Sequence, residues 1–410
     1  MPASGVLMPG LHARGMRTVH ARGVRTQMNS LRQIIESSPS VRHLGIAGAP
    51  ENAAPQPLAP PRWDWSGIHS VLVIRLRSIG DTVLATPALV TLRRFLPQAK
   101  IHILLEDWVA PVLERSPLVD QVITIPKQSN TARARLARNL HRTKYDVVYN
   151  LHGGTTATFL TRATGAPHRV GFAHYQYARL HNHIAPSPQE IWRRQDLHSV
   201  EQQLALIGWT GVPVTDRPAT QLAVTETAAR SISEKLAAKK INEAQPFALI
   251  HPAAALETKQ WATESFARVA EAVAERGLTP VAIVSPGERL VLESLRSQST
   301  TSIAGFADLT LPEVTALAAR ARLFIGNDSG IAHIAAATGT PCVVIFGSSN
   351  VTHWRPWTMG QSEVVREELA CQPCHGYFCA EFDQPQCILR VPVERVVGAI
   401  DRILGTNKFN

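Results

Sequence analysis

The sequence has no long apolar run. Its strongest apolar stretches, such as Val71–Leu76 and Phe247–Ile250, are far shorter than the roughly 20 residues that a membrane-spanning helix requires. The N-terminal residues also lack the apolar core that a secretory signal carries after its basic residues. We therefore expect a cytoplasmic protein with no transmembrane span; if it works at a membrane, it lies on the inner face of the cytoplasmic membrane.

Acidic residues are scarce at the start of the chain, where residues 1–45 contain six Arg and one Glu. This segment supplies half of the formal net charge of +10 and shows no periodic apolar pattern. We expect residues 1–62 to be a disordered tail or sequence ahead of the true start. A transit peptide is the alternative, because the segment is rich in Arg and poor in acid.

Aromatic residues are few, at 6%, but 45% of the 410 residues are hydrophobic, which suits two domains of ordinary size. Apolar strand-like runs alternate with helix-like segments, the pattern of parallel sheets with crossover helices. A GxGxxG sequence follows none of the predicted strands, which disfavours a dinucleotide-dependent dehydrogenase. The predicted domains span residues 63–235 and 236–395, with a C-terminal helix and tail at 396–410.

In open α/β sheets, ligands bind beyond the carboxyl ends of the strands, so the loops after the strands are the candidate sites. After Val71–Leu76, Gly80 allows a ligand to approach the backbone, and Asp81 places a carboxylate near a helix start. Asp81 is either a general base or a helix cap. After Phe247–Ile250, Lys259 stands in a loop of small residues, where it either neutralises a leaving group or lies on the surface.

Two further loops carry polar residues. Glu288 follows Val281–Val284 and either binds a ribose hydroxyl or caps a helix. After the strand Leu323–Ile325, a turn containing Asp328 leads into a helix whose first N–H groups favour an anion. Asp328 is a sugar ligand or an N-cap, and His333 is a sugar ligand or a buried structural residue.

Three runs of sequence resemble glycosyltransferase family 9, in the same order and spacing: VLVIRLRSIGDTVLATPAL, HPAAALETKQW and LFIGNDSGIAHIAAATGTPCVVIFG. Together with CQPCHGYFCAEFDQPQC, they are similar to the ADP-heptose:lipopolysaccharide heptosyltransferases. The resemblance covers roughly residues 70 to 405. It implies a GT-B fold, in which two Rossmann-like domains with parallel sheets face each other across a cleft.

The resemblance also implies residue roles. Asp81 would be the general base and Lys259 the residue that faces the phosphates, with Arg77 and Gly80 on the acceptor side. The donor would be bound by His251, Glu288, Asn327, Asp328, Ser329, Gly330 and His333. Because alanines Ala253–Ala255 stand where several relatives have Thr or Ser, backbone N–H groups must serve the diphosphate in their place.

The implied reaction moves a heptose from ADP-heptose to a sugar hydroxyl of the lipopolysaccharide inner core with inversion, and requires no cofactor. The partners would be a nucleotide-sugar donor and a lipid-anchored glycan acceptor at the inner membrane, with no nucleic acid involved. The alternatives are a family member acting on another bacterial glycan and a non-catalytic paralogue that binds nucleotide sugars. A hydrolase or epimerase would call for acidic metal clusters or a cofactor fingerprint, and neither is found.

Two further features also have more than one interpretation. The cysteines Cys371, Cys374, Cys379 and Cys387 have a spacing that suits structural zinc, free or redox-sensitive thiols, or disulfides. The segment 127–144 holds six Lys and Arg residues and no acid. It is either a solvated helix face or a surface that meets phosphates and acidic head groups.

Overall fold

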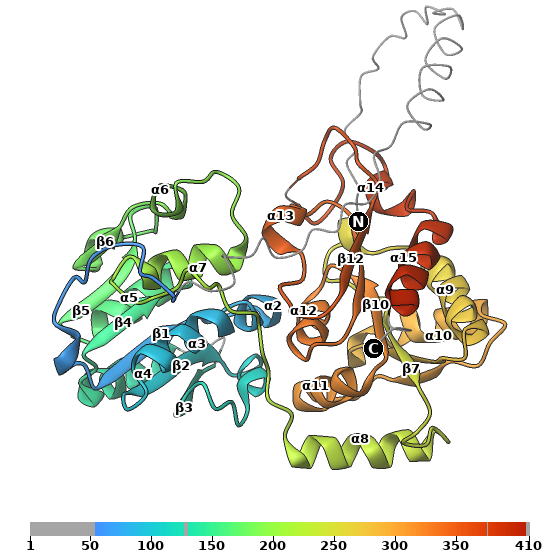
Figure 1. Ribbon diagram of the computed structural model, residues 1–410, viewed down its shortest axis with the longest axis horizontal. Coiled ribbons are helices and arrows are strands. Elements are labelled where there is room, and N and C mark those ends of the chain that lie inside the picture. The colour runs from blue at the N-terminus through green and yellow to red at the C-terminus, as the bar shows by residue number, and fades with distance from the viewer. Residues whose placement is uncertain (1–53, 127–129, 375, 407–410) are drawn as a thin grey trace, which may run out of the picture. The chain divides into compact units, whose positions relative to one another are not determined.

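The computed structural model describes residues 54–126, 130–374 and 376–406. This part of the chain is built on two six-stranded parallel sheets, the first drawn in blue and green and the second in yellow to red (Figure 1). Of the predicted tail, residues 1–53 lie outside the described residues. Among the described helices, none has both the length and the apolar character needed to cross a bilayer.

The first sheet has the strand order β3-β2-β1-β4-β5-β6. Its central strands are apolar and buried on both faces, as expected of a parallel sheet covered by helices. The strands are β1 (Ser70–Ile74), β2 (Lys100–Glu106), β3 (Gln121–Ile125), β4 (Val147–Asn150), β5 (His168–Phe172) and β6 (His183–Ala185). The helices are η1 (Trp65–Gly67), α2 (Ile79–Val83), α3 (Thr86–Phe95), η2 (Ala110–Leu113), α4 (Asn130–Thr143), α5 (Thr155–Ala163), η3 (Ala178–Leu180), α6 (Pro188–Trp192) and α7 (Ser199–Gly208).

The second sheet has the order β12-β11-β10-β7-β8-β9 and repeats the same plan. Its strands are β7 (Phe247–His251), β8 (Thr279–Ile283), β9 (Ala304–Phe306), β10 (Leu323–Asn327), β11 (Cys342–Phe346) and β12 (Ser362–Arg366). The helices are α8 (Glu226–Ala238), η4 (Glu257–Lys259), α9 (Thr263–Glu275), η5 (Pro286–Glu288), α10 (Arg289–Gln298), α11 (Leu311–Arg320), α12 (Gly330–Ala337), α13 (Val351–Trp354), α14 (Gln386–Leu389) and α15 (Val393–Thr406).

Each sheet reverses its strand order at one point, between β1 and β4 in the first and between β7 and β10 in the second. Loops on either side of such a reversal run in opposite directions and leave room for a ligand at the carboxyl edge. The register pairs Ile74 with Asn150 and Gly326 with His251, so the neighbouring strands end almost level. The loop of Asp81 and the loops of Lys259 and Asp328 therefore start at the two reversal points.

The elements suggest domain limits different from the predicted ones. Residues 54–62 are attached to the first domain: the Leu58 amide donates to the Gly208 carbonyl, and the Arg62 guanidinium lies 4.0 Å from the centre of the Trp209 ring. The predicted limit at 235/236 falls inside α8, which packs on α11. The limit at 395/396 falls inside α15, which packs on α9 and β12. We propose that the first domain begins before Leu58 and that α8 and α15 belong to the second.

Candidate active site

The carboxylate of Asp81 lies just beyond β1, in the first turn of α2. One of its oxygens forms an ion pair with the Arg75 guanidinium, and the other accepts hydrogen bonds from the Ser78 amide at 3.2 Å and the Ser78 hydroxyl at 2.9 Å. Arg75 also donates to the carbonyl of Leu151, which follows β4. Asp81 therefore does cap a helix, and two neighbouring strand ends fix its position.

The charge state of Asp81 results from opposing effects. Burial alone would raise the pKa of this carboxyl, but the positive charge of Arg75, the two Ser78 hydrogen bonds and the nearby His333 outweigh it. The pKa of Asp81 is therefore held below its ordinary value. A carboxylate that is ionised at neutral pH and partly open to solvent is able to accept a proton.

Asp81 lines a cavity of about 190 Å³ at the carboxyl edge of the first sheet. His353 and Trp354 of α13, from the second half of the chain, also line it. His152 separates this cavity from a polar one of about 280 Å³ that contains Arg77 and Glu106. Burial, together with the nearby Arg75, lowers the pKa of His152 to about 4, so its imidazole is neutral at pH 7.

The two residues predicted on the acceptor side lie in different surroundings. The Arg77 side chain is 53% exposed and lies 3.7 Å from Glu106, in the cavity next to that of Asp81. Gly80 is in close contact with α12: a Cβ atom at this position would come within 2.8 Å of the His333 ring. Any larger residue at position 80 would displace His333, which explains the glycine beside Asp81.

In the second domain, Lys259 lies at the end of η4, and its Nζ is 2.8 Å from a carboxylate oxygen of Asp328. The same oxygen accepts a hydrogen bond of 2.6 Å from the Ser349 hydroxyl. Asp328 is 5% exposed, and Lys259 is more open, so the lysine presents the positive charge at this edge. The structure thus brings together two of the sequence-predicted residues that lie 69 positions apart.

The remaining residues of the GNDSG turn hold the loops in place. Asn327 donates to the Pro252 carbonyl at 2.9 Å and accepts from the Trp261 amide at 3.1 Å, which ties both ends of the lysine loop to β10. Ser329 is the N-cap of α12, which begins at Gly330, and its hydroxyl lies 3.4 Å from Nδ1 of His251. Burial lowers the pKa of His251, so this imidazole is neutral at pH 7.

His333 lies on the first turns of α12 and is buried. Burial lowers its pKa, while the carboxylates of Asp328 and Asp81 act in the opposite direction. Its Nδ1 has no hydrogen-bond partner within the described part of the chain. Most buried polar groups in folded proteins have a hydrogen-bond partner, and a buried nitrogen without one costs free energy.

Glu288 ends the short helix η5 and accepts a hydrogen bond of 2.9 Å from the Ser285 amide. This is the capping geometry that was the alternative to a ribose contact. Its negative charge acts to raise the pKa of His251, against the effect of burial, so the two side chains lie near each other. Its ribose role stays a prediction.

All five cysteines are free thiols in the structure. Cys371, Cys374, Cys379 and Cys387 line one cavity of about 220 Å³ together with Thr258 of the lysine loop. Across the described residues, however, no three His, Cys, Asp or Glu side chains are arranged to hold a metal ion. Structural zinc, free or redox-sensitive thiols and disulfides therefore all stay predictions for this cluster.

The match to a family model decides the family. The model of glycosyltransferase family 9 (heptosyltransferase) matches residues 133–383. The chain belongs to glycosyltransferase family 9. It is therefore a glycosyltransferase, and the sequence-based assignment to this family is confirmed.

Curated relatives within the family cover most of the chain. Lipopolysaccharide heptosyltransferase 3 of Escherichia coli K12 is 29% identical over 80% of this chain and 96% of its own length. Lipopolysaccharide heptosyltransferase 2 of the same organism is 26% identical over 68% of this chain and 83% of its own.

Solved structures confirm the fold. E. coli ADP-heptose LPS heptosyltransferase II has a TM-score of 0.69 at 22% identity, over 83% of this chain and 99% of the other. E. coli heptosyltransferase WaaC with ADP-2-deoxy-2-fluoro heptose has a TM-score of 0.61 at 18% identity, over 82% and 99%. The predicted GT-B fold with two Rossmann-like domains is thus confirmed.

Sequence reasoning missed three residues that shape this region. Arg75 pairs with Asp81, His152 separates two cavities, and Ser349 shares the carboxylate of Asp328 with Lys259. Arg75 directly follows β1, and His152 stands two residues after β4, so both lie in the loops after strands that the topology marks as candidate sites. Ser349 stands three residues after the end of β11, but nothing in the sequence indicates its partner.

Proposed function

We propose that this glycosyltransferase moves a heptose from ADP-heptose to a sugar hydroxyl of the lipopolysaccharide inner core, with inversion at the anomeric carbon. The proposal rests on the ionised, partly open Asp81 carboxylate, which lines a cavity at the first reversal point. The helix that carries it, α2, packs on α12, where Gly80 lies against His333. The named activities of the relatives support the choice of sugar and acceptor.

In the proposed step, an oxygen of Asp81 accepts the proton of the acceptor hydroxyl. The hydroxyl oxygen then attacks the anomeric carbon from the face opposite the diphosphate, and the bond from that carbon to the diphosphate oxygen breaks. One bond forms as one breaks on the opposite face, so the configuration inverts. Arg75 keeps Asp81 ionised and fixed, and so acts as a positioning residue.

The leaving diphosphate carries negative charge, and we assign its stabilisation to Lys259 and to the backbone N–H groups at the start of α12. Lys259 would exchange part of its contact with Asp328 for the phosphates. His333, with its unpartnered Nδ1, is positioned to donate or accept a hydrogen bond with the bound donor. His251, Asn327, Asp328, Ser329 and Gly330 would shape this pocket, and Glu288 would bind the ribose. The proposal assigns no step to a metal ion or cofactor.

We further propose that the acceptor is a lipid-anchored glycan at the inner face of the cytoplasmic membrane and that the first domain binds it. His152 and Arg77 belong to cavities at the carboxyl edge of this domain, where a sugar with acidic groups would find cationic and hydrogen-bonding partners. The paired Arg75 and Asp81 argue against the non-catalytic alternative, because a protein that only binds has no use for a positioned base.

The function is tested by incubating the purified protein with ADP-heptose and an inner-core acceptor and detecting the product by mass spectrometry. The anomeric configuration of the product is then read by NMR. ADP-glucose and UDP-sugars serve as comparison donors. Heptose transfer with inversion from ADP-heptose is the expected result. Transfer only from another donor, or only to another glycan, would replace the proposed substrates, and binding without transfer would favour the non-catalytic alternative.

A further inference from the structure

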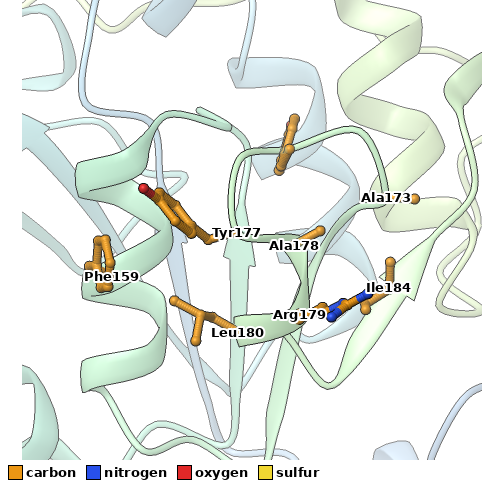
Figure 2. Close-up of a pocket in the computed structure, with 8 residues that line it drawn as sticks. Phe159, Ala173, Tyr177, Ala178, Arg179, Leu180 and Ile184 are labelled. Atoms are coloured by element: carbon orange, nitrogen blue, oxygen red, sulfur yellow. The ribbon is translucent and has the colours of Figure 1, made fainter.

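A large, open cavity lies on the first domain, outside the residues assigned to catalysis. It has a volume of about 600 Å³ and is bordered by α5, the loop after β5, η3 and β6. Figure 2 shows Phe159 and Tyr177 on one side and Arg179 and Ile184 on the other, with Leu180 between them. Apart from Arg179, these labelled side chains are apolar or aromatic, in contrast to the polar cavities near Asp81.

Several of these apolar side chains face solvent. Phe159 is 51% exposed, Tyr177 59% and Ile184 42%, and the two aromatic ring centres are 5.4 Å apart. Tyr177 has a φ of +57°, a left-handed conformation that bulky residues rarely adopt. The backbone therefore accepts strain at the residue that presents this ring. A concentration of exposed apolar residues around one cavity marks an interaction surface.

The charge around the cavity has one sign. Among the described residues that line the cavity, none is acidic. Arg179 lines the cavity, and Arg162 lies one turn after Phe159 on α5 and is exposed. Within the described part of the chain, neither arginine forms an ion pair. The positive charge at the rim is thus available to an anionic partner.

The cavity also adjoins the catalytic one. Tyr175 lines both, between the apolar residues on one side and Asp81 on the other. Whatever covers the apolar cavity is therefore held beside the cavity in which the acceptor sugar is proposed to react.

We propose that this cavity and its arginine rim dock the enzyme on an anionic lipid bilayer, with Phe159, Tyr177 and Ile184 entering the region between head groups and acyl chains. Aromatic residues flanked by arginines suit that region, because the rings enter its apolar side and the cations bind lipid phosphates. A two-fold contact between two copies of this face would place its arginines against each other, so a second copy suits it less. The proposal deepens the proposed function, since it supplies the surface on which a lipid-anchored acceptor is presented.

The test is sedimentation of the full chain with vesicles of phosphatidylcholine alone or mixed with phosphatidylglycerol, without donor or acceptor. Replacing Phe159 and Tyr177 by Ser should lower the partition coefficient on mixed vesicles about tenfold or more, also at high salt. Arg162→Gln with Arg179→Gln should lower it by a similar factor at low salt, and the loss should shrink as salt is added. The Arg-rich residues 1–45 are present in every variant, so the comparison isolates this face.

Matched controls are Leu290→Ser and Met359→Ser, which remove side chains that are 78% and 86% exposed in the second domain. They should leave the partition coefficient unchanged, and thermal melts should show that every variant is folded. The proposal would be overturned if the variant with both Phe159 and Tyr177 replaced had the partition coefficient of wild type. It would also be overturned if that variant changed its oligomeric state while its vesicle binding stayed the same. The vesicle assay contains no donor, so its result does not depend on the proposed reaction. If the protein binds vesicles through this face but transfers no heptose in the separate activity assay, only the proposed function is overturned.

Discussion

Arg75 determines how Asp81 is charged, although only Asp81 was singled out in the sequence. Burial raises the pKa of the Asp81 carboxyl, and the Arg75 guanidinium and Ser78 lower it more strongly. The pair stands within one turn of chain after β1, but its formation depends on how the chain bends back after the strand. The pattern of residue types along the sequence does not predict that bend.

Replacing Arg75 by Gln should therefore raise the pKa of Asp81, because the positive charge that lowers this pKa against the effect of burial would be gone. The acidic limb of the pH dependence of kcat, where Asp81 becomes protonated, should move to higher pH. Arg75→Lys keeps the charge and should show a smaller shift. An unchanged acidic limb in a folded Arg75→Gln variant would mean that Asp81 is not the group whose ionisation governs the rate.

Lys259→Ala should weaken donor binding and turnover together, since the lysine would meet the diphosphate both before and during its departure. We expect a loss of roughly 10- to 1,000-fold in kcat/KM. The buried Asp328 would keep only its Ser349 contact, so a thermal melt must accompany the kinetics. Lys259→Arg is the matched control. Wild-type kinetics in Lys259→Ala would remove this residue from the donor site.

The carboxylate of Glu313 is one of the polar contacts between α8 and α11. Glu313 accepts hydrogen bonds from the Thr310 amide and hydroxyl at the start of α11 and from Ser231 of α8, and it pairs with Lys235 at 2.9 Å. Burial raises the pKa of Glu313, but these partners lower it more strongly, to about 2.

Because the folded-state pKa of Glu313 is depressed, its stabilising effect is present above the unfolded value of about 4.5 and is lost as pH falls toward 2. Glu313→Gln should lower the free energy of unfolding by about 2 kcal/mol at pH 7. The difference from wild type should shrink between pH 4.5 and 2 in urea titrations. A pH-independent difference would show that packing, and not charge, is responsible.

The elements that were predicted are those with strong local signals. The strand Cys342–Phe346 was placed at its observed limits, because a buried parallel strand is a continuous apolar run. β5, with His168 and Arg169, and the three-residue β6 were not predicted, because their burial depends on neighbouring strands. The apolar cavity next to them was missed for the same reason.

The predicted candidate residues lie at strand ends, where the topology of parallel sheets places sites. The sequence does not show which of these residues contact each other. The pairing of Lys259 with Asp328 follows from β7 lying beside β10 in the second sheet, and the contact of Gly80 with His333 joins elements more than 200 residues apart. Strand order and long-range packing determine such contacts, and both arise only when the whole chain folds.

For the whole molecule, the predicted start of the fold near residue 62 can be tested by truncation. A chain that begins at Ala54 should retain full stability. One that begins at Trp63 loses Leu58, the hydrogen bonds of Gln56 with Val214 and Thr215, and Arg62 against Trp209. We expect it to be less stable by about 2–4 kcal/mol in urea titrations. If the two chains were equally stable, residues 54–62 would belong to the tail and not to the first domain.

In the proposed reaction, the two domains together perform an inverting transfer in which Asp81 takes the acceptor proton. It is tested most directly by single-turnover transfer, with ADP-heptose and acceptor saturating, in wild type and Asp81→Asn. Asn keeps the size of the side chain and can still accept a hydrogen bond from Ser78, so fold and ADP binding should be retained. We expect the Asp81→Asn variant to transfer heptose about 10²- to 10⁴-fold more slowly than wild type. A near-wild-type rate in the folded variant would contradict it.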